Sequence, residues 1–516
     1  MGRLARLIRA RPWLAIALIA AVGRLPAFLR PLLDDDEAQY AAIAELVRAG
    51  GRLYADGGVD NKPPGIYWTY AAVFDVAGRY AMWAVHLLAL AVVIATAWIL
   101  CAIATRIASR RAGLLAGVFY GVFTTVYYPK MLAANTEIFL TLALSAAVLV
   151  VLRARAAAGR GGLTAWAATG ALVGVATGYK QSAVLGLTVI AAGAVIAAGA
   201  AATRAWPARL AAAVAGFAAV LGAGALAVAA TSSLPAMWHW CVIQLGAYAA
   251  SAWRGSIGHN LAVGLVPFVA SSLLVWLAGA ARAARIRTSG AAERIVWVWF
   301  AISLASALAG GHWFGHHFLQ PLAPLAVLAA LEVDHRLGDR PGDRLGEPPR
   351  RALVRGLAAL TALPAIGFFV FNLVFEPITE SFGAPDPDFR RPAAWVRAHT
   401  GPGDRIFVWG NFAPLYVLAD RLPASRFVGF LRGTERNHGA PPQASWDTGP
   451  EVWPALAEDF AHHPPTVVID TSTADYQSFG NDPIQRFPAV AALLRGYRVA
   501  AVVDGVTMYM PAGVSP

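Results

Sequence analysis

The sequence is poor in charged residues. Asp, Glu, Lys and Arg make up 14% of its 516 residues, whereas a soluble domain carries roughly 25%. This shortage excludes disordered, fibrous and ordinary soluble globular proteins. The chain is instead rich in apolar residues, which make up 58% of it and give a mean hydropathy of +0.54. The composition therefore predicts a membrane protein.

Cysteine and lysine are also scarce. The two cysteines, Cys101 and Cys241, lie in distant apolar runs, which excludes a disulfide framework and a cysteine metal site. Among the 42 basic residues only Lys62, Lys130 and Lys180 are lysines. The sequence contains neither a Walker loop nor a dinucleotide-binding fingerprint. Any energy for the reaction must therefore come with the substrate or from a gradient.

Long apolar runs fill most of the chain before residue 375. A membrane-crossing helix needs about 20 mostly apolar residues, and about eleven stretches approach this requirement. We expect them to span the membrane: 12–30, 81–104, 112–128, 135–152, 163–178, 182–202, 208–230, 259–281, 295–309, 317–333 and 352–374. The basic segment before the first stretch resembles the start of a signal peptide. However, no small-residue cleavage site follows and Arg24 interrupts the run, so we expect a retained helix.

Arginine is distributed unevenly between the segments that join these stretches. The net charge is +12, and the basic side chains gather in every second segment: 1–11, 105–111, 153–162, 203–209, 282–294 and 334–351. This alternation follows the positive-inside rule and places the N-terminus in the cytoplasm. An odd number of helices then places the C-terminal region outside the cytoplasm. Membrane orientation thus explains the basic charge, with no nucleic acid as a partner.

The C-terminal region has more proline, aspartate and polar residues than the rest. Short β-type runs alternate there with helical stretches. The predicted strands are Arg405–Trp409, Thr466–Asp470, Tyr497–Asp504 and Val506–Met510, and the predicted helices are Pro392–His399, Pro450–His463 and Pro488–Gly496. We expect a polytopic α-helical membrane domain over 1–375 and a small extracytoplasmic α/β domain over 376–516.

Ionisable residues gather in the segments predicted to lie outside the cytoplasm, which suggests one site there, because such groups near a membrane are costly and usually functional. An acidic run, Asp34, Asp35, Asp36 and Glu37, precedes Tyr40 and a helical stretch. A carboxylate in this position can act as a general base, so Asp36 and Glu37 are the catalytic candidates. Helix N-capping is the alternative, above all for Asp34 and Asp35.

A second segment reads Asp60-Asn61-Lys62-Pro63-Pro64. The two prolines restrict the backbone and hold Lys62 at a set position. Lysine is a compact charge suited to phosphate, and a chain that otherwise uses arginine has kept lysine here. A snorkelling interfacial lysine is the alternative interpretation. We take Asn61 and Lys62, together with Tyr40 after the acidic run, as candidate substrate-binding residues.

Two further segments carry candidate substrate-binding residues. Lys180 lies in a very short turn between apolar runs, whereas Lys130 has the context of an ordinary loop cation. Asn135 and Glu137 open an apolar run, where capping of a helix is the alternative to binding. An unpaired carboxylate one turn inside such a run is expensive. Glu137 therefore needs a partner, such as a lysine or a sugar hydroxyl.

A glycine-rich segment contains His312, His316 and His317. Their spacing invites a zinc interpretation, but no helical i,i+4 pair, cysteine or carboxylate close in sequence accompanies them. We expect His316 and His317 to donate hydrogen bonds to phosphate or sugar oxygens. No residue is assigned as a metal ligand, although a divalent metal stays open as a cofactor.

Together these motifs resemble the polyprenyl-phosphate-sugar glycosyltransferases of the GT-C fold, within the bacterial aminoarabinose transferase and protein mannosyltransferase group. The order of the motifs and their spacing carry the resemblance. They are Asp36-Glu37-x-x-Tyr40, Lys62-Pro63-Pro64-x-x-x-Trp68, an acid at the start of the fourth apolar run, a lysine after the fifth, and the segment that begins with His316 and His317.

The resemblance implies a role for each matched position. Asp36 matches the acid that serves as the catalytic base, and Lys62 matches a lysine that meets the lipid phosphate. Glu137 stands at the acid of the second catalytic loop, and Lys180 matches a lysine near the sugar phosphate.

Two positions depart from the family. Gln39 stands where related enzymes often have arginine, and Asn61 stands where they often have glutamate. These changes remove a phosphate cation and one possible metal ligand, so the sugar is not identified.

The resemblance implies an enzyme of the bacterial inner (cytoplasmic) membrane. It would move a monosaccharide from a polyprenyl-phosphate donor to a hydroxyl of a lipid, glycan or protein in lipopolysaccharide or cell-envelope glycosylation, with a periplasmic active site. A polytopic transporter or lipid-linked sugar flippase is the alternative, because it also needs charges within the membrane. The lack of a twofold repeat in the sequence and the one-sided clustering of charge speak against it. A non-catalytic receptor would leave the acids and lysines unexplained.

Overall fold

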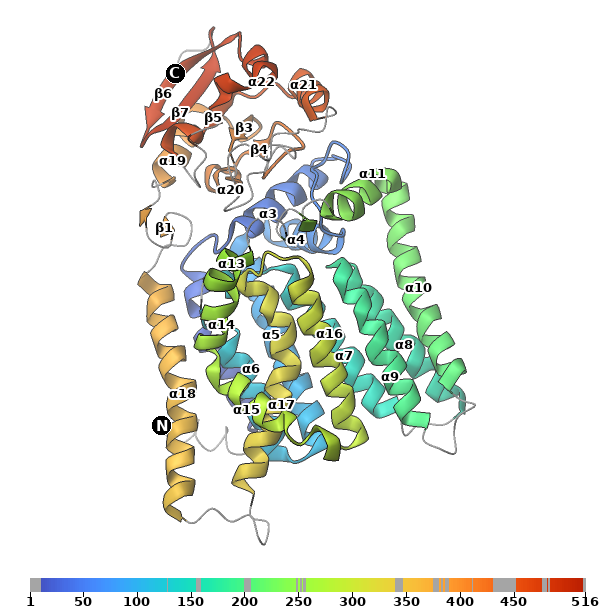
Figure 1. Cartoon of the computed structure of the whole chain (residues 1–516). Coiled ribbons are helices and arrows are strands. Elements are labelled where there is room, and N and C mark those ends of the chain that lie inside the picture. Colours follow the sequence, from blue (N-terminus) through green and yellow to red (C-terminus); the bar gives the residue numbers. More distant parts are fainter. Residues whose placement is uncertain are drawn as a thin grey trace. The chain divides into compact units, whose positions relative to one another are not determined.

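A computed structural model shows how these segments fold (Figure 1). It describes residues 11–127, 129–154, 159–198, 206–246, 249–250, 253, 257–338, 347–374, 380–381, 384–385, 389–410, 412–429, 452–475, 480 and 483–513. Parts of the predicted cytoplasmic segments, such as 1–10 and 339–346, lie outside these residues.

The chain divides into two compact units, each built from separate stretches of sequence. The first contains 1–29, 86–225 and 252–374, and the second contains 30–85, 226–251 and 375–516. The predicted C-terminal α/β region therefore shares its unit with the segments that carry Asp36 and Lys62. The predicted boundary between two domains at residue 375 stays a prediction.

The first unit is a set of apolar helices. They are α2 (Trp13–Gly23), α5 (Met82–Ile107), α6 (Arg110–Phe123), α7 (Thr136–Ala154), α8 (Gly159–Thr177), α9 (Gly186–Ala198), α10 (Trp206–Thr231), α13 (Ile257–Asn260), α14 (Val266–Ser271), α15 (Leu273–Ala283), α16 (Ala291–Ala309), α17 (Leu319–Leu337) and α18 (Glu347–Val374). Each stretch predicted to span the membrane falls on one of these helices or on a consecutive set of them. The helical fold predicted for this region is confirmed.

Several helices have the length and composition to cross a membrane. Among the described residues 5 helices meet both conditions, namely α5, α7, α10, α16 and the part of α18 from Arg351 to Val374, and a sixth span results if the bent pair Ile257–Ser271 and Leu273–Ala283 counts as one. Only 6% of the apolar window of α18 is buried within the protein, and Leu363 and Ile366 of this helix are exposed. Such side chains need lipid as their solvent, so the chain is a multi-pass membrane protein.

Close helix packing in the first unit depends on small residues. Helix α17 is buried from Leu319 to Val333 and packs against α6, α15 and α16. A Cβ at Gly170 of α8 would lie 1.7 Å from the carbonyl oxygen of Ala213, and one at Gly216 of α10 would lie 1.9 Å from that of Ala167. These two glycines let the backbones of α8 and α10 approach as small residues do in membrane helix pairs.

The second unit combines short helices with a sheet. Its helices are α3 (Asp35–Arg48), α4 (Gly65–Ala77), α11 (Leu234–Trp238), α19 (Arg390–His399), α20 (Pro414–Ala419), α21 (Val452–His462) and α22 (Pro488–Leu493). The sheet has 5 strands in the order β4-β3-β5-β7-β6. The strands are β3 (Arg405–Trp409), β4 (Leu422–Pro423), β5 (Val467–Asp470), β6 (Tyr497–Val503) and β7 (Val506–Pro511).

Strand direction in this sheet follows from the connections. Strand β3 is parallel to β4 and β5, as expected where helices α20 and α21 join the strands. Strand β7 is antiparallel to both β5 and β6, and a tight turn joins it to β6. The four strands and three helices predicted from the sequence are confirmed to within a few residues. Helix α20 and the two-residue strand β4 were not predicted.

Hydrogen bonds attach the α3–α4 region to the sheet region within the second unit. Helix α3 packs against α20 and β4. The amide of Val59 donates to the carbonyl of Arg426 at 3.0 Å, and the Tyr80 hydroxyl donates to the carbonyl of Arg421 at 3.1 Å. Arg79 also pairs with Asp420 at 3.2 Å. The acidic run and the lysine segment are therefore parts of the same folded unit as the α/β sheet.

Candidate active site

The acidic run starts helix α3. Asp34 is the N-cap residue, and its side chain accepts a hydrogen bond from the amide of Asp36 at 3.5 Å. This is the capping alternative stated for Asp34 above. Asp36 lies in the first turn and is half-buried. The positive end of the helix dipole favours its ionised form, which is the form that a general base needs.

Glu37 is placed differently from Asp36. It is 0% exposed, and its Oε2 accepts a hydrogen bond from the amide of Leu33 at 3.0 Å. A glutamate three residues after the N-cap that reaches back to the preceding backbone closes the start of a helix, as in a capping box. The geometry gives Glu37 a role in holding the acidic run, and it favours Asp36 as the base.

Tyr40 lies in an aromatic cluster between α3 and α4. It is 1% exposed, and its ring meets those of Tyr67 and Tyr70 edge to face, with centroids 5.9 Å apart in each pair. Such pairs stabilise packing beyond the area that they bury. Tyr40, a predicted substrate-binding residue, therefore fixes α3 against α4.

Backbone and side-chain contacts hold the lysine segment in place. The Tyr54 hydroxyl donates to the Lys62 carbonyl at 2.8 Å, and the Cys241 thiol lies 3.2 Å from the same oxygen. The Lys62 ammonium donates to Oδ1 of Asn61 at 2.9 Å and lies 4.0 Å from Oδ2 of Asp60. Lys62 therefore has a fixed position, as its two following prolines predicted.

Asp60 organises this segment, although the sequence analysis gave it no role. It is 2% exposed and accepts hydrogen bonds from the amide of Asn61 at 2.6 Å and from the Tyr67 hydroxyl at 2.6 Å. Burial, together with the charge of Asp60, raises the pKa of Tyr67 well above its usual value. Tyr67 therefore stays protonated as a donor to Asp60.

We expect the substitution Tyr67→Phe to destabilise this segment. It removes one donor from a buried carboxylate, and a hydrogen bond to a charged group is worth about 1.5–3 kcal/mol. Thermal unfolding in detergent should show a lower Tm. The control is Tyr509→Phe, which loses only an exposed hydrogen bond with Gln485. An unchanged Tm for Tyr67→Phe would contradict the anchoring role of Asp60.

The other five candidates lie in the first unit and form a group of their own. Glu137, in the first turn of α7, is 1% exposed. The ammonium of Lys180 donates to its Oε1 at 2.5 Å, and the Thr136 hydroxyl donates to its Oε2 at 3.0 Å. The sequence predicted that Glu137 needs a partner, and Lys180 is that partner. Asn135 is fully buried beside it at the start of α7, where its carbonyl accepts from the amide of Ile138.

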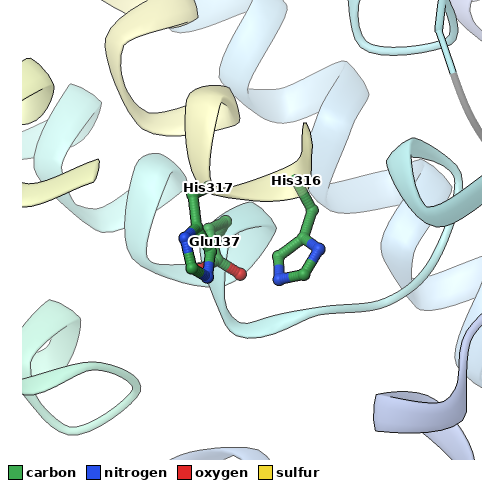
Figure 2. A group of neighbouring side chains, drawn as sticks. All are labelled: Glu137, His316 and His317. Atoms are coloured by element: carbon green, nitrogen blue, oxygen red, sulfur yellow. The ribbon is translucent and has the colours of Figure 1, made fainter. Parts of the chain in front are cut away.

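Two histidines lie against the same carboxylate. His316 and His317 belong to the 3-10 turn Gly315–Phe318 that precedes α17, and both rings lie close to the Glu137 side chain (Figure 2). One ligand atom from each of the three residues lies within 4.8 Å of the others. A carboxylate and two imidazoles are ligands that Zn²⁺ accepts. The sequence around the two histidines contains no carboxylate ligand. The fold brings one to them, the side chain of Glu137.

Lys130 was expected from its sequence context to be an ordinary loop cation. Its ammonium lies 5.8 Å from the centroid of the Phe314 ring, and Phe314 in turn stacks with His312 and His316. Lys130 therefore lies near the cluster formed by His312, His316 and His317, which we call the histidine cluster. The sequence feature that could have pointed to this is the scarcity of lysine, since Lys130 is one of only three.

A buried arginine supports the loop that leads into α7. Arg24 is 1% exposed, and its guanidinium donates to the carbonyls of Met131 and Leu132. In the sequence, Arg24 stands out only because it interrupts the first apolar run. A charged side chain in such a run needs hydrogen-bond acceptors, and this requirement could have predicted that Arg24 supports another segment.

Residues 61–224 match the protein family described as dolichyl-phosphate-mannose-protein mannosyltransferase. The match covers less than half of the chain but includes Lys62, Asn135, Glu137 and Lys180. No curated protein matches the sequence.

Solved structures match nearly the whole chain. ArnT from Cupriavidus metallidurans bound to undecaprenyl phosphate is 15% identical, with a TM-score of 0.61 and 98% of both chains covered. The oligosaccharyltransferase AglB from Archaeoglobus fulgidus, in complex with an inhibitory peptide and a dolichol-phosphate, is 11% identical, with a TM-score of 0.55, 99% of this chain covered and 75% of that one. The same oligosaccharyltransferase in complex with Zn and sulfate gives a TM-score of 0.56 at 14% identity, over 97% of this chain and 73% of that one.

These similarities settle the fold. The chain shares the GT-C fold with these solved structures, as the resemblance predicted. The comparisons give no support to the transporter alternative.

Proposed function

We propose that this protein is a glycosyltransferase that moves a monosaccharide from a polyprenyl-phosphate donor to a hydroxyl of a lipid, glycan or protein acceptor. The observation that carries the proposal is the fold shared with ArnT over 98% of both chains, a protein solved with undecaprenyl phosphate bound. The family match and the AglB structure with dolichol-phosphate support the same class of donor.

Each candidate residue is given the task that suits its chemistry. In the second unit, Asp36 takes the proton of the acceptor hydroxyl as that oxygen attacks the anomeric carbon of the donor. The bond from that carbon to the polyprenyl phosphate breaks, and the departing phosphate gains charge. Lys62 offsets this charge as a compact cation. In the first unit, Lys180 and the histidine cluster provide further donors for phosphate or sugar oxygens.

A divalent metal ion fits the first unit. Glu137, His316 and His317 offer one ligand atom each within 4.8 Å, and a structural neighbour was solved with Zn and sulfate. The metal would supply positive charge for a phosphate oxygen. Since Lys180 donates to one oxygen of Glu137, the other oxygen of this carboxylate would be the one to hold the metal.

We expect His317→Ala to weaken Zn²⁺ binding to the purified protein at least about tenfold, because loss of even an outer partner of a metal ligand costs 10–100-fold. Isothermal titration with Zn²⁺ measures this without any transfer reaction. His335→Ala, at the far end of α17, is the control and should leave the affinity unchanged. Equal affinities for all three proteins would exclude the metal site.

The membrane location follows from the same proposal. We place the protein in a bacterial inner (cytoplasmic) membrane with a cytoplasmic N-terminus and the sheet of the second unit outside the cytoplasm, since arginine gathers in alternate segments. Single cysteines at Arg287 and at Arg391, introduced in a variant without Cys101 and Cys241, should differ in labelling by an impermeant thiol reagent. Only the cysteine at position 391 should react in intact cells.

The function is tested with the purified protein, a radiolabelled polyprenyl-phosphate sugar and a membrane extract as a source of acceptors. Covalent transfer of the label to a lipid, glycan or protein supports the proposal. Movement of the label across vesicle membranes without covalent transfer would instead support a transporter.

A further inference from the structure

The second unit contains a cavity of about 500 Å³ that the proposed chemistry does not use. Its walls come from the loop after α3, the start of β3, the turn after β4 and the end of α21. The charged and titratable residues of its lining include Arg52, Asp56, Arg405, Arg426, Asp459 and His463. Neither Asp36 nor Lys62 lines it. The volume lies in the range of small-molecule sites and suits a monosaccharide with one charged substituent.

The walls of this cavity are held by short contacts. A Cβ at Gly51 would lie 2.6 Å from Cα of Gly57, so the loop closes on itself through two glycines. The Arg52 guanidinium donates to Oδ2 of Asp56 at 2.9 and 3.0 Å. A site with such walls exists before any ligand arrives.

Ion pairs neutralise the acids of the opposite wall. The Arg426 guanidinium donates to Oδ1 of Asp459 at 2.7 and 2.9 Å and to Oε2 of Glu458 at 2.8 Å. Asp459 is buried, and its Oδ2 accepts from the Ser425 hydroxyl at 2.9 Å. These carboxylates therefore repel an anion little. Asp459 already accepts four hydrogen bonds from Ser425 and Arg426, whereas the more exposed Glu458 and Asp56 keep acceptor positions for sugar hydroxyls.

Arg405 is the cation of the cavity that lacks a carboxylate of its own. It is half-buried, its Nη1 donates to the carbonyl of Pro423 at 3.0 Å, and within the described residues it has no ion pair. Burial and the nearby Arg79 lower its pKa. Asp459, whose charge raises the pKa of Arg405, is already paired with Arg426. A half-buried guanidinium without a carboxylate partner can bind an anionic ligand through charge-assisted hydrogen bonds.

Two histidines, His462 and His463, also line this cavity. Burial lowers the pKa of His463, and the charge of Arg405 lowers it further; His462 acts in the same direction, while Asp459 and Asp56 oppose it. Nδ1 of His462 lies 2.9 Å from the carbonyl of Glu458 and must carry a proton to donate to it. Because its pKa is lowered, His463 would meet an anion as a neutral N–H donor beside the charged Arg405.

We propose that this cavity binds a phosphorylated sugar, with Arg405 and His463 on the phosphate and the paired carboxylates on the hydroxyls. A guanidinium matches a phosphate with two parallel hydrogen bonds. The shared chemistry, a phosphate monoester on a sugar, can come from a free sugar phosphate or from the head group of a phosphorylated glycolipid. The binding does not depend on the transferase function.

Isothermal titration of the full-length protein in nanodiscs tests this, with glucose 1-phosphate, glucose and inorganic phosphate as probes. We expect glucose 1-phosphate to bind more tightly than either of the other two. Arg405→Gln should weaken its binding about 10-fold to 100-fold, and His463→Gln should weaken it less. Arg391→Gln, which removes an exposed arginine paired with Asp504 elsewhere in the same unit, should bind like the unmodified protein.

Further measurements separate the sources and the possible failures. Monophosphoryl lipid A in the nanodisc should compete with glucose 1-phosphate if the natural ligand is a glycolipid head group, and should not if it is a free sugar phosphate. A Tm measurement identifies unfolding of Arg405→Gln, in which case His463→Gln decides. Equal binding of glucose and glucose 1-phosphate, no binding of either soluble probe or lipid, or full affinity in both cavity variants would overturn the proposal. Asp36→Asn should bind the probe normally even when transfer is lost.

Discussion

Replacement of Asp36 by asparagine is expected to abolish most of the sugar transfer while the protein still folds and inserts into the membrane. Removal of a general base typically costs about 10²–10⁴-fold in rate. The change is nearly isosteric and affects a half-buried side chain in the first turn of α3. The rate of label transfer from a polyprenyl-phosphate sugar, measured at saturating donor, should fall within this range.

The neighbouring carboxylate provides the control for this experiment. Asp35→Asn removes the same charge from the same helical turn, so both variants lose a similar interaction with the helix dipole, worth about 0.3–1 kcal/mol. Both should therefore show a similar small decrease in Tm. Only Asp36→Asn should lose transfer. Full activity in Asp36→Asn, or an equal loss in Asp35→Asn, would remove Asp36 from the role of base.

The acidic run shows what a sequence can and cannot tell about a site. Four consecutive acids predicted a helix start, with capping above all for Asp34 and Asp35 and catalysis for Asp36 or Glu37, and the resemblance implied Asp36 as the base. The helix register separates these candidates, because it places Asp34 at the N-cap and turns Glu37 back to the amide of Leu33. Asp36 stays half-buried in the first turn. The pattern of residues predicted the site, and the backbone direction favours Asp36 over Glu37 as the base.

Elements that bury apolar residues at a regular spacing were predicted well, and short ones were missed. Strand β5 (Val467–Asp470) is a run of buried residues that reads as a strand from the sequence. Strand β4 has two residues, Leu422–Pro423, which is too short for any alternation. Its position depends on its pairing with β3, a contact that no local pattern encodes.

Contacts between one segment and another account for further residues that were missed. Asp60 was passed over because its role depends on Tyr67, which lies one turn into the next helix and donates to it. The metal interpretation of His316 and His317 lacked a carboxylate because Glu137 is far away along the chain. Each of these groups makes sense only once the fold has brought its partner close.

The ion pair between Glu137 and Lys180 should show the largest stability effect. Lys180→Met leaves the Glu137 carboxylate, which is 1% exposed, without its 2.5 Å partner. Breaking a buried pair in this way costs about 3–5 kcal/mol. Glu137→Gln leaves Lys180, whose side chain is 16% exposed, and should cost less because part of the ammonium reaches solvent. Thermal unfolding in detergent should rank the two variants in this order.

The double variant Glu137→Gln with Lys180→Met separates stability from function. It removes both charges, so no buried ion stays unpaired, and its Tm should exceed that of Lys180→Met alone. If the pair also binds substrate or metal, this recovery of stability should not restore transfer, because the groups that contact phosphate or sugar are gone. Recovery of both Tm and transfer would show that the pair only holds α7 in place. A Tm no higher than that of Lys180→Met would show that the charges do not depend on each other.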